Sequence, residues 1–214
     1  QKTKPLAYTI NLDFMSAYGD KRGGTYQVPG HKGYPNNVIF VFDAAFEEFC
    51  DQQAKKLVAY KDDANLFGYF SDNEMPLGIK NLDGYLTLKD QQDPGYIVAK
   101  KWIDDRGVDA TKLTDDDRHA FLAVVAEKYF SVVAKAIKKY DPNHMYLGCR
   151  FHGQQGNLAE LWIAAGKYTD AISMNYYNAW TPDQRLMAKW ASWAGKPFMI
   201  TEWYVKGDDA GLEN

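Results

Sequence analysis

Residues 66–74 read Leu66-Phe67-Gly68-Tyr69-Phe70-Ser71-Asp72-Asn73-Glu74, a short apolar run that ends in four polar residues. Residues 197–204 repeat the pattern as Pro197-Phe198-Met199-Ile200-Thr201-Glu202-Trp203-Tyr204. Apolar runs of this length are typical of buried strands in parallel sheets, and the carboxyl ends of such strands carry the chemistry of many α/β enzymes. Each run therefore predicts a strand with a glutamate at its carboxyl end.

The rest of the chain surrounds these two runs with further strands and helices. Apolar stretches predict three more strands, at 6–13, 144–150 and 171–175. Helical spacing of apolar residues predicts helices at 43–60, 94–104, 114–140, 157–165 and 182–194. The segments 14–37 and 75–93 have no helical period and are predicted to be long loops. Alternating strands and helices indicate an α/β fold made of parallel βα units.

A (β/α)8 TIM barrel accounts for this alternation better than a doubly wound sheet does. No strand leads into a Gly-x-Gly-x-x-Gly turn, which weakens the doubly wound alternative. The 214 residues are fewer than the roughly 250 of a complete barrel, and only five strands are predicted. We therefore expect an incomplete barrel in which residues 1–214 form a single catalytic domain, a fragment of a longer protein.

The composition argues against several classes of partner. The formal net charge is −3 with both signs mixed along the chain, which gives no reason to expect nucleic acid or membrane binding. Cys50 and Cys149 form neither a disulfide framework nor a zinc pattern, so buried free thiols are expected. The sequence contains no metal-ligand spacing, nucleophile elbow or phosphate loop. We expect no metal and no cofactor, and the sequence does not indicate an oligomeric state.

Glu74 and Glu202 are the candidate catalytic residues. A carboxylate at the mouth of a buried strand loses solvation, a cost that is explained if the site uses the group. Two carboxylates from separate strand ends can face one another across a barrel mouth. Retaining glycoside hydrolysis requires such a pair about 5–5.5 Å apart, one protonated and one ionised. The alternative for a single glutamate after a strand is a solvated loop residue or a helix cap.

The two glutamate motifs resemble those of clan A glycoside hydrolases. In that clan the acid/base ends strand four, after an Asn such as Asn73, and the nucleophile ends strand seven. The same interval separates Glu74 from Glu202 here, so the chain would hold strands three to seven. Residues 68–74 and 201–207 look most like the β-agarases of glycoside hydrolase families 50 and 86, and residues 208–214 continue in a similar way.

The resemblance implies a secreted, periplasmic or cell-surface bacterial enzyme that cuts β-1,4 galactosidic links in red-algal galactans. Glu74 would protonate the departing oxygen and later activate water, while Glu202 would attack the anomeric carbon. Asn73 would bind the 2-hydroxyl of the sugar at the cleavage site. Tyr176 is the candidate to hydrogen-bond the nucleophile, with Tyr177 as the second choice because strand alternation turns only one of them inward.

Further residues are candidates for substrate binding. Arg150 and His152 would position sugar or carboxylate, the alternative being a salt-bridged loop. His31 could reach a sugar from its long loop, and Trp203 and Trp180 could stack on sugar rings. Two other functions stay open: a catalytically silent carbohydrate-binding barrel, and a lyase or isomerase that uses one Glu as a base.

Overall fold

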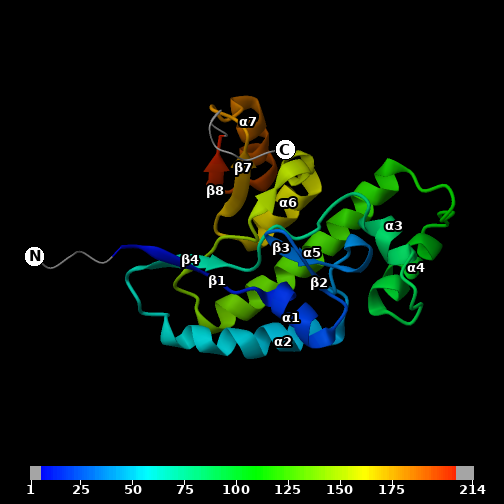
Figure 1. Cartoon of the computed structure of the whole chain (residues 1–214), viewed down its shortest axis with the longest axis horizontal. Coiled ribbons are helices and arrows are strands. Elements are labelled where there is room, and N and C mark those ends of the chain that lie inside the picture. The colour runs from blue at the N-terminus through cyan, green and yellow to red at the C-terminus, as the bar shows by residue number, and fades with distance from the viewer. Residues whose placement is uncertain (1–5, 206–214) are drawn as a thin grey trace, which may run out of the picture.

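The computed structural model describes residues 6–205 as a mixed α/β fold whose helices pack against two short parallel sheets (Figure 1). The strands are β1 (Tyr8–Asn11), β2 (Tyr26–Val28), β3 (His31–Gly33), β4 (Leu66–Phe70), β5 (Met145–Tyr146), β6 (Phe151–His152), β7 (Ile172–Tyr177) and β8 (Phe198–Tyr204). The α-helices are α1 (Phe14–Arg22), α2 (Ala44–Ala54), α3 (Asn81–Leu86), α4 (Pro94–Asp105), α5 (Asp115–Tyr140), α6 (Ala159–Tyr168) and α7 (Gln184–Ala194). Short 3-10 helices cover Pro35–Asn37, Lys55–Ala59 and Gly153–Asn157.

The parallel strands lie side by side in the order in which they occur along the chain. One sheet has the order β1-β4-β5 and the other β6-β7-β8. Backbone hydrogen bonds join the two sheets. The amide of Ser71 donates to the carbonyl of Gly148, and the amide of Glu74 donates to the carbonyl of Arg150. The stretch that contains β5 and β6 therefore lies between β4 and β7. The predicted mixed α/β class and its parallel βα units are confirmed.

The prediction of one continuous strand at 144–150 was wrong. β5 ends at Tyr146 and β6 begins at Phe151, just beyond the predicted range, and between them Gly148 and Arg150 have φ angles of 80° and 54°. A positive φ interrupts the extended backbone, so one stretch pairs with β4 through β5 and with β7 through β6.

Two predicted loops contain regular structure. Segment 14–37 contains α1 and the β2–β3 hairpin, and segment 75–93 contains α3. No side chain of its own caps α1, and two amides of its first turn, at Met15 and Ser16, donate instead to the carboxylate of Asp72, which follows β4. A helix that depends on a cap 56 residues away has no local signal in the sequence.

The other predicted helices are present with shifted ends, and α5 begins with a capping box. Thr114 accepts from the amide of Asp117, whose side chain accepts from the amide of Thr114. The predicted helix 43–60 is α2 followed by a 3-10 turn. Helix α5 carries eleven buried residues and lies against α2 and α6 at the centre of the fold. Cys50 and Cys149 are buried free thiols, as predicted.

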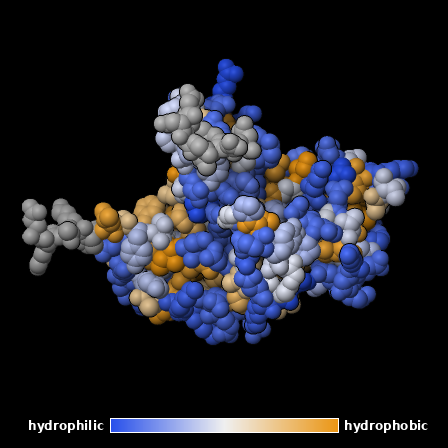
Figure 2. All heavy atoms as spheres, viewed as in Figure 1, coloured by the Kyte–Doolittle hydropathy of each residue, from blue (hydrophilic) through white to orange (hydrophobic). Residues whose placement is uncertain are grey.

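Hydrophilic side chains cover most of the face seen in Figure 2, and hydrophobic ones gather at the end where β1 and β4 begin. Leu6 and Phe67 contribute exposed apolar surface there, with 86% and 42% of their areas accessible. None of the helices among residues 6–205 is long and apolar enough to cross a membrane.

Candidate active site

Four residues with left-handed backbone mark the carboxyl ends of the parallel strands. Asp13, Glu74 and Asn178 follow β1, β4 and β7, and Arg150 precedes β6, with φ angles between 47° and 62°. Such angles are uncommon for residues other than glycine and cluster at functional sites. The strained positions therefore identify this edge of the sheets as the candidate active site.

Glu74 and Glu202 meet at this edge through the hydroxyl of Tyr177. The Tyr177 hydroxyl lies 2.5 Å from Oε2 of Glu202 and 2.9 Å from Oε1 of Glu74, and its one proton is donated to one of them at a time. These two oxygens can be no farther apart than the sum of the two distances. That limit falls within the roughly 5–5.5 Å of a retaining pair and below the 6.5–9.5 Å or so of an inverting pair.

Glu202 also pairs with Arg150. The guanidinium Nη2 of Arg150 is in hydrogen-bonding contact with Oε1 of Glu202, so each carboxylate oxygen has its own donor. These two contacts hold the Glu202 carboxylate in place beside Glu74. Glu202 lies inside β8, which continues to Tyr204, whereas the sequence predicted that the strand would end at this residue.

Glu74 is more enclosed than Glu202. Its side chain is 14% exposed, against 41% for Glu202. Burial acts to raise the pKa of Glu74, but hydrogen bonds from Asn175 and Tyr177 and the nearby His152 and His31 outweigh it, so the pKa is lowered. The carboxyl group is therefore ionised when no sugar is bound.

Asn175 also belongs to the candidate site, although it was not among the residues predicted from the sequence. Its Nδ2 donates to Oε1 of Glu74 over 2.8 Å, and its Oδ1 accepts from the hydroxyl of Thr201 over 2.8 Å. Because the Thr201 hydroxyl can only donate to that oxygen, the amide must present its N–H to Glu74. The available signal was the polar residue at the end of an otherwise apolar predicted strand.

Tyr177, the second choice from the sequence, takes the place predicted for Tyr176. The hydroxyl of Tyr176 accepts from the amide of Asp183, and its ring packs against Trp190, away from the carboxylates. The ring of Tyr177 packs on Tyr204 instead, with centroids 4.9 Å apart. The alternation of side chains along β7 explains the choice between the two tyrosines.

Two histidines flank Glu74. Nδ1 of His31, on the β2–β3 hairpin, lies 3.9 Å from Oε2 of Glu74, and the rings of His31 and His152 are 6.1 Å apart. Burial lowers the pKa of His152. The hairpin thus brings His31, from a segment predicted to be a loop, close to Glu74.

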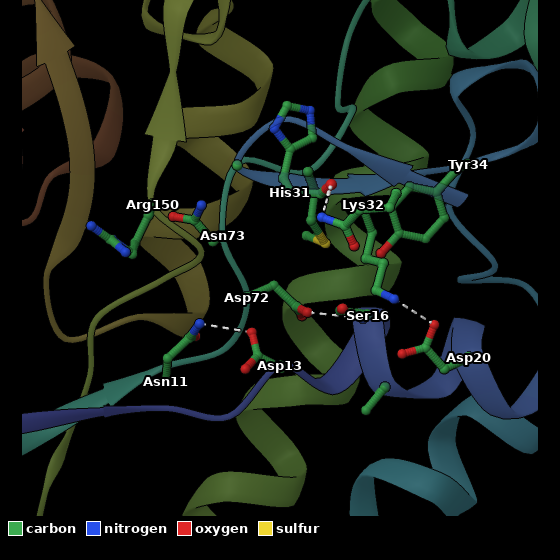
Figure 3. Close-up of a pocket in the computed structure, with 14 residues that line it drawn as sticks. Asn11, Asp13, Ser16, Asp20, His31, Lys32, Tyr34, Asp72, Asn73 and Arg150 are labelled. Atoms are coloured by element: carbon green, nitrogen blue, oxygen red, sulfur yellow. Dashed lines mark hydrogen bonds and ion pairs between the residues drawn. The ribbon is translucent and has the colours of Figure 1, made fainter. Parts of the chain in front are cut away.

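Asn73 lies beside Glu74 and lines a pocket of about 530 Å³, here called the Lys32 pocket. Figure 3 shows Asn73 and Arg150 on one side of this pocket and the Lys32–Asp20 ion pair on the other. Oδ1 of Asn73 is buried and has no hydrogen-bond partner among residues 6–205. An amide oxygen without a partner is free to accept from a ligand hydroxyl.

The two predicted stacking tryptophans lie at the rim. Trp180 is 76% exposed and follows β7, while Trp203 is 50% exposed and donates from its indole to the carbonyl of Ala179. Strand alternation turns Trp203 away from the face that carries Glu202 and Tyr204. Among the described residues there is no group of three or more His, Cys, Asp and Glu side chains placed to hold a metal ion.

A close pair of carboxylates at the carboxyl ends of two parallel strands defines the glycoside hydrolase class of site. The chain resembles one family within that class. It is 26% identical to β-agarase B of Vibrio sp. strain JT0107 over 210 residues, which cover 80% of this chain and 22% of that protein. No protein-family model matches the chain.

Two solved structures are also similar to this chain. BpGH50 is 32% identical, with a TM-score of 0.84 over 99% of this chain and 48% of that one. The agarase AgWH50C is 25% identical, with a TM-score of 0.61 over 82% of this chain and 28% of that one. The resemblance to family 50 β-agarases is confirmed, and the chain spans about half the length of BpGH50 and about a fifth of the length of β-agarase B. Residues 206–214, part of the motif quoted for this resemblance, lie outside the described residues.

Proposed function

We propose that the protein is a retaining β-glycoside hydrolase that acts on an agar-type galactan. The observation that carries the proposal is the Tyr177 hydroxyl, which lies within hydrogen-bonding distance of both Glu74 and Glu202 and sets the spacing of a retaining pair. The similarity to agarases supports the choice of polysaccharide. The carbohydrate would be the substrate, and no cofactor enters the reaction.

Glu202 is the proposed nucleophile. Arg150 and Tyr177 each stabilise its negative charge, so it can attack the anomeric carbon and form a glycosyl-enzyme. Attack by Oε1 or Oε2 neutralises that charge and releases the corresponding donor. If Oε2 attacks, the Tyr177 hydroxyl is released and can donate its hydrogen bond to Glu74, its other neighbour.

Glu74 is the proposed acid/base. It must hold a proton to release the leaving group, although its pKa is lowered in the free site. Burial is the largest influence on this pKa and acts upward, and a neutral sugar laid over Glu74 increases that burial. Substrate binding thus favours the protonated form of Glu74, which is the form that can donate to the leaving group. In the second step Glu74 removes a proton from the water that frees the sugar.

Asn73 is the proposed ligand of the 2-hydroxyl of the sugar under attack. Its unpartnered Oδ1 can accept that hydroxyl proton next to Glu74. His31 and His152 would bind hydroxyls on either side of the scissile bond. Trp203 and Trp180, at the rim, would contact sugar units farther along the chain.

We further propose that the parallel strands are strands three to seven of a (β/α)8 barrel, carried by residues 1–214 as one catalytic domain. The unbroken order β1, β4, β5/β6, β7, β8 supports this assignment, as does the position of Glu74 after the second strand and Glu202 on the fifth. Secretion or cell-surface location belongs to the same proposal, because a galactan is too large to enter a cell.

The test is covalent trapping of the nucleophile. A 2-deoxy-2-fluoro-β-galactosyl fluoride should add one glycosyl group to Glu202, detected by intact mass and peptide mapping, because fluorine slows hydrolysis of the intermediate. Glu202→Gln should abolish the adduct. Glu74→Gln should still form it, because fluoride is a leaving group that departs without protonation by Glu74.

The fate of natural substrate completes the test. Hydrolysis of agaro-oligosaccharides should be lost in both variants, and azide should rescue Glu202→Ala as a glycosyl azide. If the chain binds oligosaccharide but neither hydrolyses it nor forms the fluorosugar adduct, it is a catalytically silent binding barrel. That result would refute the proposed hydrolase function. Hydrolysis that survives either substitution would refute the assigned roles.

A further inference from the structure

Glu74 has an unfavourable backbone conformation. Its φ angle of 47° lies in the left-handed region, which a residue with a side chain adopts only where the surrounding structure holds it there. The direction in which the Glu74 carboxyl group points therefore depends on the contacts that fix the backbone before and after this residue.

The backbone up to Glu74 is fixed by the sheets and by Asp72. The amide of Glu74 donates to the carbonyl of Arg150 over 3.3 Å, and the buried Asp72 side chain accepts from the amides of Met15 and Ser16. Residues 75–80, which follow Glu74, belong to no strand or helix, since β4 ends at Phe70 and α3 begins at Asn81. This segment needs a different support.

Gln155, in the 3-10 turn after β6, supplies that support. Its Nε2 donates to the carbonyl of Met75 over 2.5 Å and to the carbonyl of Leu77 over 3.2 Å, while its Oε1 accepts from the amide of His152 over 2.9 Å. Carbonyls only accept and a backbone amide only donates, so these contacts determine which end of the side chain is oxygen. The side chain is 5% exposed, so water does not compete for these hydrogen bonds.

Two stacked tryptophans hold the turn that carries Gln155. The indole of Trp162 donates to the carbonyl of Gln155 over 3.1 Å, and the indole of Trp190 donates to the carbonyl of Gly156 over 2.7 Å. The rings are fully buried and nearly parallel, with centroids 4.9 Å apart. They come from α6 and α7, which pack on one another (Figure 1), so the turn rests on a rigid base.

We propose that Gln155 is a positioning residue for the acid/base. By fixing the carbonyl of Met75, the residue next to Glu74, it holds the Glu74 carboxyl group where a proton can pass to and from the substrate. This inference rests on the proposed hydrolase function and adds a residue that acts through Glu74 and not on the sugar. Proton transfer needs the two heavy atoms within about 2.6–3.2 Å, so a small displacement of Glu74 is costly.

The experiment compares two substrates that differ in their need for an acid. In both, Glu202 attacks the anomeric carbon and the bond to the leaving group breaks. The departing oxygen of an agaro-oligosaccharide takes a proton from Glu74, whereas a β-galactosyl fluoride releases fluoride ion without one. The value of kcat/KM reports the steps up to formation of the glycosyl-enzyme, so for the fluoride it does not depend on proton donation by Glu74.

Gln155→Met keeps the length of the side chain and removes its hydrogen-bonding groups. It should lower kcat/KM for the oligosaccharide about tenfold or more and change kcat/KM for the fluoride less than about threefold. Both values come from one sample, so their ratio does not depend on the fraction that is folded. Trp190→Phe, which removes the hydrogen bond to Gly156, should shift the ratio in the same direction by a smaller amount.

Thr169→Val is the matched control. It removes a hydroxyl that is 2% exposed and donates to the carbonyl of Ala165 at the end of α6, so it deletes a buried hydrogen bond that does not involve the segment after Glu74. The ratio of the two kcat/KM values should stay as it is in the unsubstituted chain, even if the variant is less stable.

Azide supplies an independent readout from the second step. Azide attacks the anomeric carbon of the glycosyl-enzyme and releases Glu202 without help from a base, so it should speed turnover of the fluoride by Gln155→Met and yield a glycosyl azide. The unsubstituted chain should gain less. Equal loss on both substrates, or no loss on either, would overturn the inference and leave the hydrolase standing. An unsubstituted chain that turns over neither substrate would refute the hydrolase, and this inference with it.

Discussion

Tyr177 is the residue that links the two carboxylates of the proposed catalytic pair. Its hydroxyl is the one group within hydrogen-bonding distance of both Glu74 and Glu202 among the described contacts. Tyr177→Phe should lower kcat for oligosaccharides by about a hundredfold, the usual effect of removing one donor aimed at developing charge. Steady-state kinetics should show a larger change in kcat than in KM. Tyr176→Phe is the matched control and should change kcat less than about threefold, since its hydroxyl meets the amide of Asp183.

Asn175 controls the proton affinity of Glu74. Its N–H stabilises the ionised form and lowers the pKa of Glu74, so Asn175→Ala should raise that pKa. The acid form of Glu74 would then persist to higher pH, and the alkaline limb of the kcat/KM profile should move upward. Thr201→Val should shift the limb in the same direction by a smaller amount, because the amide keeps its place and loses only the hydroxyl that orients it. An unmoved or lowered limb would contradict the assignment.

At the scale of elements, Asp72 joins β4, α1 and α5 two residues before Glu74. It is 1% exposed, accepts from the amides of Met15 and Ser16, and accepts from the hydroxyl of Tyr129 over 2.7 Å. Asp72→Ala should cost about 2–3 kcal/mol of unfolding free energy, because the N-terminus of α1 loses its cap inside the core. Urea denaturation would measure the change.

The stability that Asp72 contributes should also depend on pH. Burial raises its pKa from 3.8 to about 7, so the folded state holds the proton more tightly than the unfolded state does. Its stabilising contribution is complete below the unfolded pKa and is lost as the pH rises through about 7. The unfolding free energy of the parent minus that of Asp72→Asn should therefore fall between pH 5 and pH 8 in urea titrations. A difference that rises over this interval would contradict the raised pKa.

The packing of α6 on α7 depends on a glycine. A Cβ atom at Gly166 would lie 2.1 Å from the carbonyl oxygen of Ala194, which is backbone and cannot rotate away. Gly166→Ala should destabilise the fold by about 2–3 kcal/mol by separating the two helices. Gly78→Ala is the control, since nothing lies within 4 Å of its Cβ position, and it should be neutral or slightly stabilising in thermal unfolding.

At the scale of the whole molecule, β1 and β8 occupy the two ends of the parallel strand order within residues 6–205. Each pairs with one neighbour in that order, and exposed apolar side chains such as Leu6 and Phe67 lie near β1 and β4. Unpaired strand edges beside apolar surface favour association. The chain should self-associate at micromolar concentration in sedimentation velocity, and Phe67→Lys should weaken this association. A sedimentation coefficient that does not change with concentration would contradict the prediction.

The sequence by itself determined the features that depend on local pattern. Apolar runs of strand length and helical spacing located the parallel strands and most helices. A glutamate at the end of each of two such runs made Glu74 and Glu202 candidates, because the carboxyl ends of parallel strands converge at one edge.

The tertiary structure alone decided the features that depend on distant partners. Helix α1 exists because Asp72 caps it from β4, and the choice of Tyr177 over Tyr176 follows from which face of β7 turns toward the carboxylates. Asn175 became a site residue only when β7 lay between β6 and β8, within reach of Glu74. These contacts join residues 25, 57 and 101 positions apart, and no local periodicity records which of them will meet.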